Sequence, residues 1–257
     1  MPYDWYAILH YDGRDFAGWQ KQAAARTVQG ELEAALEKLV GHRLPTHAAG
    51  RTDSGVHAVG QTVSFQLPTE WPGDRLQRAL NALTAPDLWV AVTGPAPAGF
   101  HARKHAVARE YRYVIGCDAA AQSPFRAPYE WALRDPLDPE RLVAGARCIE
   151  GTHDFRGLSA VGQTKSHYRC GVTRAEWRTR PGNEGFTFHI EADRFLHRMV
   201  RFLVGLMVDV ARDRRPLEDI PRLLSSPSNQ EASAPAPPQG LYFLRARYPQ
   251  FDPRPSA

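Results

Sequence analysis

One carboxylate stands in a setting suited to nucleophilic chemistry. Asp53 lies between Gly50 and Gly55, with Arg51 two residues before it and an alternating apolar segment after it. Glycines let the backbone take a positive φ or approach a ligand closely. In an extended segment Arg51 shares a side with Asp53, and a nearby cation favours the ionised carboxylate. We therefore expect Asp53 to be a fixed anion and a potential nucleophile, although Asp-Ser-Gly is also a common turn.

An aromatic residue among arginines is the second candidate. Tyr111 follows Arg109 by two positions and directly precedes Arg112 in an alternating segment. An aromatic ring beside arginines can stack on a nucleobase while the guanidinium groups hold its phosphate. A core tyrosine on a sheet face has the same spacing, so both interpretations stay open.

The segment Phe100–His105 is a compact basic cluster that contains His101, Arg103 and Lys104. His101 and His105 have the i, i+4 spacing of a helical metal pair, and a histidine-based metallohydrolase is therefore one hypothesis. The glutamate of an HExxH motif is missing, and no third ligand is evident. Phosphate contact or a solvated surface is the favoured interpretation.

The segment 195–201 is predicted to begin a helix with an apolar stripe facing a core. His197 and Arg201 then lie four residues apart on another face, and Arg194 and Arg198 form a neighbouring row. Such a helix can line a basic groove, or it can be an ordinary amphipathic helix with an arginine-rich wet side.

Composition indicates a soluble globular protein with an anionic partner. The chain has 257 residues, 43% hydrophobic and 23% charged, with a formal net charge of +4. The three cysteines are widely spaced without a CxxC pair, which argues against a zinc knuckle or a disulfide framework. No secretory signal is visible, and the apolar run from Phe202 to Val208 is too short to span a bilayer. We expect a reducing cytoplasmic setting and no membrane.

Alternation and capping signals predict the elements that must position these residues. Strands are expected around residues 3–11, 63–67, 111–115, 177, 186–190 and 241–244. Thr27 is a predicted N-cap and Gly41 a predicted terminator of one helix. Asp74 is a predicted cap of a second helix, and Asp138-Pro139 opens a third. Residues 94–99 are predicted to be a loose connection and residues 234–238 a stiff linker.

These elements predict an α+β fold with a largely antiparallel mixed β-sheet and helices on its outer side. The order of strands and helices repeats after a break near residue 104. We therefore expect two similar halves, residues 1–104 and 105–257.

Several common catalytic motifs are absent from the sequence. It contains no GxxxxGK[ST], GxGxxG or GxSxG pattern, and Ser54 with His57 lacks the context of a serine hydrolase. A reaction that needs no ATP, nicotinamide or metal is consistent with what remains.

Six motifs, in order, resemble the TruA family of tRNA pseudouridine synthases over nearly the whole chain. They are Tyr11-Asp12-Gly13 with Gly18-Trp19-Gln20 and Thr27-Val28-Gln29, Gly50 to Ala58, Phe100-His101-Ala102-Arg103, Arg109 to Tyr113, Phe195 to Arg201, and Gly240-Leu241-Tyr242. One departure is Leu158, where family members often carry a second aromatic residue; it concerns local packing and not the chemistry.

The resemblance implies a pseudouridine synthase fold with a central basic cleft and a catalytic role for Asp53. It implies that Arg51 pairs with Asp53 and takes the place of the flipped base, that Tyr111 stacks on the uracil and is a candidate for handling the C5 proton, and that Leu241 lines the uracil pocket.

The resemblance also implies the substrate and the assembly. The family isomerises uridines at positions 38 to 40 of the anticodon stem-loop across many tRNAs, as a homodimer and without a cofactor. His101, Arg103, Arg109, His197 and Arg201 are expected to contact the RNA. A catalytically silent RNA-binding module on the same scaffold shares the basic surface, and only turnover separates the two hypotheses.

Overall fold

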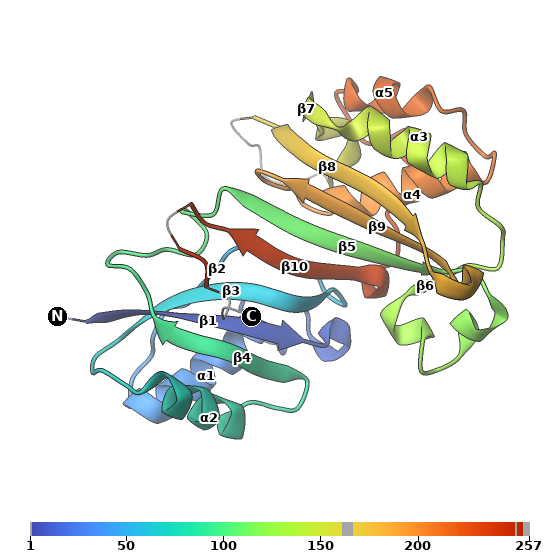
Figure 1. Cartoon of the computed structure of the whole chain (residues 1–257). Helices are drawn as coiled ribbons and strands as arrows, with labels where there is room; N and C mark the ends of the chain where they lie inside the picture. Colours follow the sequence, from blue (N-terminus) through green and yellow to red (C-terminus); the bar gives the residue numbers. More distant parts are fainter. Residues whose placement is uncertain (1, 161–166, 250, 254–257) are drawn as a thin grey trace. The chain divides into compact units, whose positions relative to one another are not determined.

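The computed structural model describes residues 2–160, 167–249 and 251–253, in two compact units (Figure 1). The first unit consists of Met1–Arg109 and Tyr242–Ala257, and the second of Glu110–Leu241. The sequence predicts a boundary between residues 104 and 105. The units of the structure divide after Arg109, and the end of the chain returns to the first unit because its strand pairs there.

The strands of the first unit pair mostly antiparallel, in the order β4-β1-β3-β10, with β2 beside β3. Their bounds are Tyr3–Tyr11 for β1, His47–Ala48 for β2, His57–Leu67 for β3, Leu88–Pro95 for β4 and Leu241–Arg247 for β10. The predicted alternation in β1 is confirmed at Trp5, Ala7, Leu9 and Tyr11, which are buried, but Tyr3 is exposed and Ile8 is buried as well. β10 is parallel to β3, with Tyr242 opposite His57.

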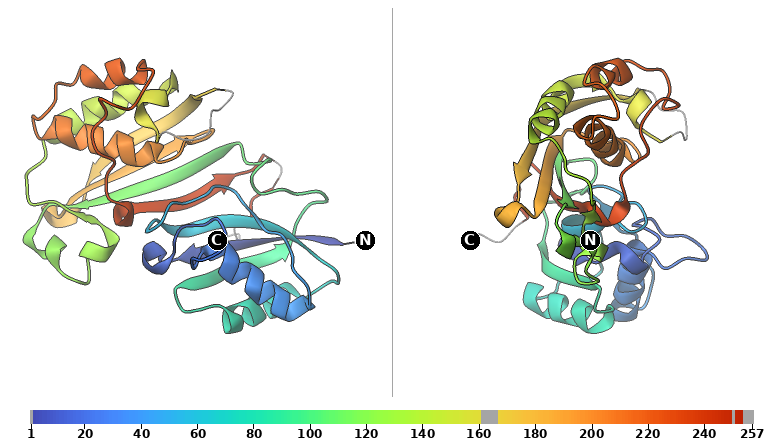
Figure 2. Two further views of the ribbon diagram at one scale, coloured as in Figure 1. Left: turned by 180° about the vertical axis from the view of Figure 1, so that it is seen from behind. Right: turned by 90° about the vertical axis from the view of Figure 1, so that its right-hand side faces the viewer.

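Two helices cover one face of these strands (Figure 2). They are α1, Val28–Val40, and α2, Gly73–Leu83. The predicted caps of α1 are confirmed: the Thr27 side chain accepts from the Gly30 N–H, and Gly41 is left-handed at φ 82°. The predicted cap of α2 is wrong. Pro72 precedes the helix, so Asp74 lies inside its first turn, where it pairs with Arg78.

The predicted loose connection at residues 94–99 is partly wrong, because its first two residues belong to β4. Gly94 lies opposite Tyr6 and Pro95 opposite Trp5 in the antiparallel pairing with β1. Pro95 ends β4, which is an edge strand of the sheet, so the missing N–H of the proline costs no hydrogen bond between strands. The sequence did not predict β4, since its closing Gly-Pro is typical of a loop.

The strands of the second unit follow the order β5-β9-β8-β7, with β6 parallel to β5. Their bounds are Ala108–Gly116 for β5, Trp131–Ala132 for β6, Gly151–Asp154 for β7, Arg169–Thr179 for β8 and Gly185–Ala192 for β9. β8 pairs antiparallel with both β7 and β9, and Trp177 lies opposite Phe188. These pairs confirm the strands predicted around Tyr111, Trp177 and Phe188.

The helices of the second unit gather on one side of its strands (Figure 2). They are α3, Pro139–Ile149, α4, Met199–Ala211, and α5, Asp219–Leu224. The predicted start of α3 is confirmed, because the Asp138 side chain accepts from the N–H groups of Glu140 and Arg141. Leu158, the departure from the family pattern, is fully buried.

Helix α4 begins later than the sequence predicts. Arg198 has a left-handed φ of 59°, so the helix starts at Met199. Arg194 and His197 precede it, and the predicted helical rows of Arg194 with Arg198 and of His197 with Arg201 are therefore wrong. The apolar side chains of α4 are buried nearly all round, which is a core helix and not an amphipathic one.

The predicted stiff linker also differs, because it packs against α4. The Ala236 N–H donates to the Arg201 carbonyl at 2.9 Å, and the Arg201 Nε donates back to the Ala236 carbonyl at 2.7 Å. A Cβ on Gly205 would lie 2.2 Å from the Ala234 carbonyl oxygen. The segment is a packed strap, held closely by a glycine in the helix.

The chain is thus α+β with mostly antiparallel strand pairs, as predicted. Short 3-10 helices complete it at Gly13–Asp15, Ala119–Gln122, Ala127–Tyr129, Arg156–Leu158, Pro181–Asn183 and Pro238–Gly240. Within the described residues, no helix is long and apolar enough to cross a membrane.

Candidate active site

Asp53 lies in a tight turn just before β3. The Val56 N–H donates to the Asp53 carbonyl at 3.2 Å, and Gly55 is left-handed at φ 78°. Asp53 is half-buried and Arg51 is exposed. We call residues 49–56 the Asp53 loop. The turn expected from Asp-Ser-Gly is therefore present and holds the backbone of Asp53. The anionic state of Asp53 and its pairing with Arg51 stay predictions.

A buried polar network forms the floor of the Asp53 loop. The hydroxyl groups of Tyr11 and Thr52 are hydrogen-bonded at 2.9 Å. The Gln61 amide nitrogen donates to the Gly50 carbonyl at 2.7 Å and to the Tyr11 hydroxyl at 3.4 Å. Burial raises the pKa of Tyr11 to about 12, against the opposite effect of its bonds to Thr52 and Gln61. Tyr11 is therefore a neutral hydroxyl that fixes the loop.

The segment after β1 holds the loop from a second side. The Trp19 N–H donates to the Thr52 carbonyl at 3.0 Å, and the Ser54 hydroxyl donates to the Phe16 carbonyl at 3.2 Å. Two glycines permit this approach. A Cβ on Gly13 would lie 2.1 Å from the Val56 carbonyl oxygen, and one on Gly18, at φ 94°, would lie 2.8 Å from that of Thr52. At both Gly13 and Gly18 the backbone packs directly against the backbone of the Asp53 loop, so there is no room for a side chain.

His57 joins the loop to the C-terminal strand. Its Nδ1 lies 3.1 Å from the Gly13 N–H donor and 3.3 Å from the Asp12 Oδ1. Its ring stacks on Tyr242, with centroids 4.8 Å apart and planes at 20°. The predicted opening, catalytic and C-terminal motifs thus meet at one buried histidine in the first unit.

An arginine clamp supports the segment that holds the loop. Arg26 binds Asp87 through two nitrogens at 2.6 and 2.7 Å, and its guanidinium lies 4.1 Å from the centre of the Phe16 ring. The Asp12 N–H also donates to the Asp87 carbonyl at 3.0 Å. The hydrogen bonds from Arg26 lower the pKa of Asp87.

Sequence reasoning missed these supporting residues. Tyr11 lies in the opening motif, which implies no role for its hydroxyl, and Gln61, Arg26 and Asp87 lie outside the six motifs. The available signal was Gln61, a polar residue in the middle of an apolar strand, since buried polar side chains need a partner.

The basic residues of the first unit divide into two kinds. Arg109 donates to the backbone carbonyls of Ala49, Ala106 and Arg103, at 2.7 to 3.2 Å, which holds the segment 101–109 beside the Asp53 loop. Arg103 is exposed and His101 is partly exposed. Contact of all three with RNA stays a prediction.

Tyr111 and Leu241 lie in the second unit and are both nearly buried, at 7% and 6% exposure. The edge of the Tyr111 ring meets Phe195, with centroids 4.9 Å apart. His197 is exposed, whereas Arg201 is half-buried and bonded to the strap. Tyr111 is therefore a buried sheet residue whose ring packs on Phe195, and its role toward a base stays a prediction.

The described residues contain no group of three His, Cys, Asp or Glu side chains that could hold a metal ion. The proposed pair His101 and His105 lies in a turn and not on a helix, and the Nδ1 of each ring accepts a backbone N–H. That use of the rings removes the geometric basis for the metallohydrolase hypothesis.

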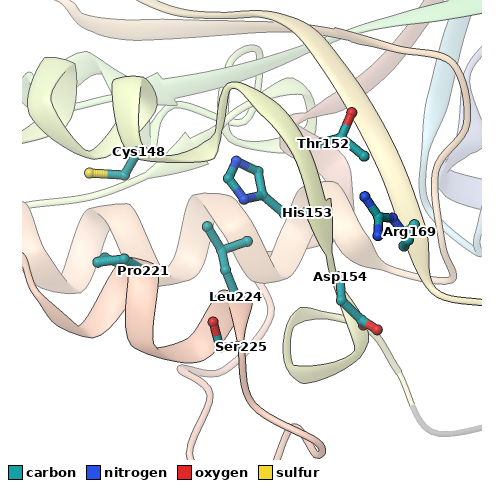
Figure 3. Close-up of a pocket in the computed structure, with 8 residues that line it drawn as sticks. All are labelled: Cys148, Thr152, His153, Asp154, Arg169, Pro221, Leu224 and Ser225. Carbon is teal, nitrogen blue, oxygen red and sulfur yellow. The ribbon is translucent and has the colours of Figure 1, made fainter.

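A pocket of about 450 Å³ opens in the second unit between α3, β7 and α5 (Figure 3). Its lining consists of Cys148, Thr152, His153, Asp154, Arg169, Pro221, Leu224 and Ser225. The His153 Nε2 is 2.7 Å from the carbonyl of Glu150, the C-cap residue of α3, so this ring is tied to the end of the preceding helix. None of the predicted site residues lines this pocket.

Comparison with known proteins identifies the family. Residues 7–103 and 146–249 match the family described as tRNA pseudouridine synthase. The chain is 38% identical over 242 residues to tRNA pseudouridine synthase A of Moorella thermoacetica, covering 93% of this chain and 97% of that protein. It is 35% identical over 243 residues to the protein of the same name from Streptococcus pneumoniae (strain Taiwan19F-14), covering 94% and 97%. The chain therefore belongs to the tRNA pseudouridine synthase A (TruA) family of isomerases.

Proposed function

We propose that this protein isomerises uridine to pseudouridine at positions 38, 39 and 40 of the anticodon stem-loop of tRNAs, with Asp53 as the nucleophile. The observation that carries the proposal is the Asp53 loop. Gln61 and Trp19 hold its backbone and Tyr11 holds its Thr52 side chain, so the carboxylate stands on a rigid support at a half-buried position. The names of the relatives support tRNA as the substrate.

The chemistry needs one anionic nucleophile and no cofactor. The N1–C1′ bond of uridine breaks, the base turns, and a C5–C1′ bond forms. The proton leaves C5 and N1 gains one, so atoms and electrons balance within the nucleotide and solvent. A carboxylate that attacks C1′ or C6 can enable this sequence. A rigid support keeps the attacking oxygen in place, and holding a reacting group in the right geometry increases the reaction rate.

The remaining residues bind and shape the substrate. The target base must leave the stem at a cost of about a few kcal/mol. Arg51, exposed beside Asp53, takes the place of the flipped base. Tyr111 stacks on the uracil and handles the C5 proton, and Leu241 supplies an apolar wall. Phosphate contacts by the basic side chains explain tolerance of different tRNA sequences. The active assembly is a homodimer.

Tritium release from tRNA labelled at uridine C5 tests this function. The Asp53→Asn variant is expected to lose at least about 1000-fold in turnover, because an amide cannot replace the nucleophile. Asp15→Asn, at an exposed aspartate near the same loop, is the matched control and is expected to react at the wild-type rate. Full turnover by Asp53→Asn would refute the assignment.

Binding of the same tRNA distinguishes an enzyme from a silent RNA-binding module. Asp53→Asn is expected to bind tRNA like the wild type, and affinity is expected to fall steeply with salt as phosphate contacts are screened. Wild-type protein that binds tRNA and releases no tritium would favour the silent module. A flat salt response would refute the role given to the basic side chains.

A further inference from the structure

Residues 100–105 of the first unit, which we call the histidine loop, are fixed from beneath by apolar and backbone contacts. Phe100 is nearly buried, with its ring centre 5.1 Å from that of Tyr248. Ala102 is fully buried; its N–H donates to the Ser64 hydroxyl at 3.0 Å, and its carbonyl accepts from the Tyr248 hydroxyl at 2.9 Å. A backbone held in this way presents the intervening polar side chains outward.

Hydrogen bonds set the tautomer of two imidazoles in this loop. The His101 Nδ1 accepts from the backbone N–H groups of Arg103 and Lys104, at 3.2 and 3.4 Å. The His105 Nδ1 accepts from the N–H of His101 at 3.3 Å. A ring nitrogen that accepts a hydrogen bond carries no proton, so each neutral ring has its proton on Nε2. In that tautomer each ring can donate a hydrogen bond from Nε2 without carrying charge.

The titratable groups that act on His101 are all basic. His47, on β2, stacks on the His101 ring with centroids 4.3 Å apart and planes at 18°. His47 lies opposite Ser64, the same serine that anchors Ala102. From its own loop, Lys104 and His105 act on the ring. The pKa of His101 is lowered, first by burial and then by His47, Lys104 and His105, against the opposite effect of a backbone hydrogen bond.

Among the residues that the structure describes, no carboxylate pairs with the cations of this cluster. Arg103 and Lys104 are exposed, and neither side chain makes an ion pair in the part of the chain that the structure describes. The cluster thus combines cations that have no carboxylate partner in that part of the chain with neutral hydrogen-bond donors held in place. Such a combination suits the binding of a group that carries negative charge and several acceptor oxygens. A phosphodiester has both properties.

We propose that the histidine loop is a phosphodiester-binding surface, in which His101 and His105 donate from Nε2 as neutral imidazoles, Arg103 and Lys104 supply the charge, and His47 buttresses the His101 ring. The proposal rests on the proposed function for the source of the phosphates, the backbone of the substrate RNA. It adds His47, His105 and Lys104 to the binding residues and places the ring proton of His101 and His105 on Nε2.

The salt dependence of tRNA binding separates a neutral donor from a charged one. In His101→Asn the amide oxygen replaces Nδ1 and keeps the loop bonds, but the outward donor is lost. Affinity for an unmodified tRNA transcript is expected to fall about tenfold, as for a hydrogen bond to a charged group. The slope of log affinity against log salt is expected to stay unchanged, because no counterion release is lost. Lys104→Gln is expected to flatten that slope by roughly one.

His42→Asn is the matched control, since His42 is an exposed histidine whose Nδ1 faces the Val40 carbonyl and not an N–H. It is expected to bind like the wild type. The loss in His101→Asn is expected to be the same at about pH 7 and about pH 8.5, because a neutral ring does not titrate there. Three results for His101→Asn would each overturn the proposal. They are a loss of affinity that disappears at the higher pH, a flatter slope of log affinity against log salt, and an affinity equal to that of the wild type.

Long-range 15N spectra of the wild type test the tautomer without any variant. His101, assigned by its absence in His101→Asn, is expected to show the pattern of an Nε2–H ring, free and with tRNA bound. A doubly protonated ring in the complex would overturn the proposal. Tritium release by the wild type is measured in parallel, so that the two proposals can fail separately. If the wild type turns over and His101→Asn binds tRNA normally, only the phosphodiester surface is refuted. If His101→Asn binds tRNA more weakly but the wild type does not turn over, only the isomerase assignment is refuted.

Discussion

The Asp53 loop and the histidine loop belong to the same unit but are held by different forces. Tyr11, Gln61 and two glycine contacts fix the Asp53 loop through a buried polar network and close backbone packing. Phe100 and Ala102 fix the histidine loop mostly from an apolar base. The first arrangement positions one carboxylate closely; the second displays several donors and cations at once. Damage to the first should therefore lower kcat, and damage to the second should raise KM.

The strongest test of this contrast is Gly13→Ala. The new Cβ would meet the Val56 carbonyl oxygen at 2.1 Å, so backbone must move on one side. We expect a loss of about 1–3 kcal/mol in the free energy of unfolding, typical of overpacking, and about a 100-fold fall in kcat as Asp53 shifts. Chemical denaturation and single-turnover tritium release measure the two effects.

Gly171→Ala is the control for that change, because its Cβ would have only ordinary contacts, the nearest at 3.6 Å. It should leave kcat within about twofold, as expected for a substitution away from the site. If Gly13→Ala kept wild-type kcat, the Asp53 loop would not need its close packing, and the contrast between the two loops would fail.

Tyr11→Phe tests the polar floor by removing one oxygen atom. Thr52 and Gln61 lose a buried partner, which costs about 1–3 kcal/mol. We expect kcat to fall about tenfold with little change in KM, since the loop loosens without losing RNA contacts. Tyr3→Phe, on the same strand but 45% exposed, is the control. An effect confined to KM would assign Tyr11 to substrate binding instead.

Local patterns in the sequence predicted much of this architecture. Thr27, Gly41 and Asp138 act as the caps that their side chains and positions indicate. Apolar alternation located the strands at Tyr3–Tyr11 and Ala108–Gly116 because a half-buried strand requires it. The Asp53 turn was also visible, since glycine, aspartate and serine favour turns for local reasons.

The failures come from interactions between distant residues. Tyr11 bonds to a residue 41 positions away and Gln61 to one 50 positions away, so no local pattern indicates these partners, although a polar residue in an apolar strand marks Gln61 as needing one. The start of α4 was misplaced because the helical spacing of apolar residues continues past Arg198, whose left-handed φ breaks the helix. The last strand was assigned to the wrong unit of the structure because only its pairing with β3 brings it back.

Ser64→Ala tests the anchoring of the histidine loop. The Ala102 N–H loses its acceptor, at 3.0 Å, beneath the loop. We expect KM for tRNA to rise about threefold, with a smaller change in kcat, because one hydrogen bond contributes about 1 kcal/mol. Steady-state kinetics measure both constants, and Ser123→Ala in the second unit is the control. A fall in kcat that exceeds the rise in KM would mean that a change in the histidine loop also displaces the Asp53 loop.

The smallest expected effect concerns the Arg26–Asp87 clamp and its dependence on pH. Hydrogen bonds from Arg26 lower the pKa of Asp87 in the folded protein, so this pair stabilises the fold when the aspartate is ionised. The sign follows from linkage: its contribution is present above the ordinary aspartate pKa, near 4, and is lost as the pH falls below it. The partners are partly exposed, so we expect only about 0.5–1 kcal/mol.

Asp87→Asn should remove that pH dependence and leave kcat at neutral pH within about twofold, because Phe16 retains its other contacts to the Asp53 loop. Urea unfolding from pH 7 down to about pH 3 measures the difference between wild type and variant. The two curves should converge as the pH falls. A difference that is constant with pH would mean that Arg26 holds the loop through packing on Phe16, and not through its charge on Asp87.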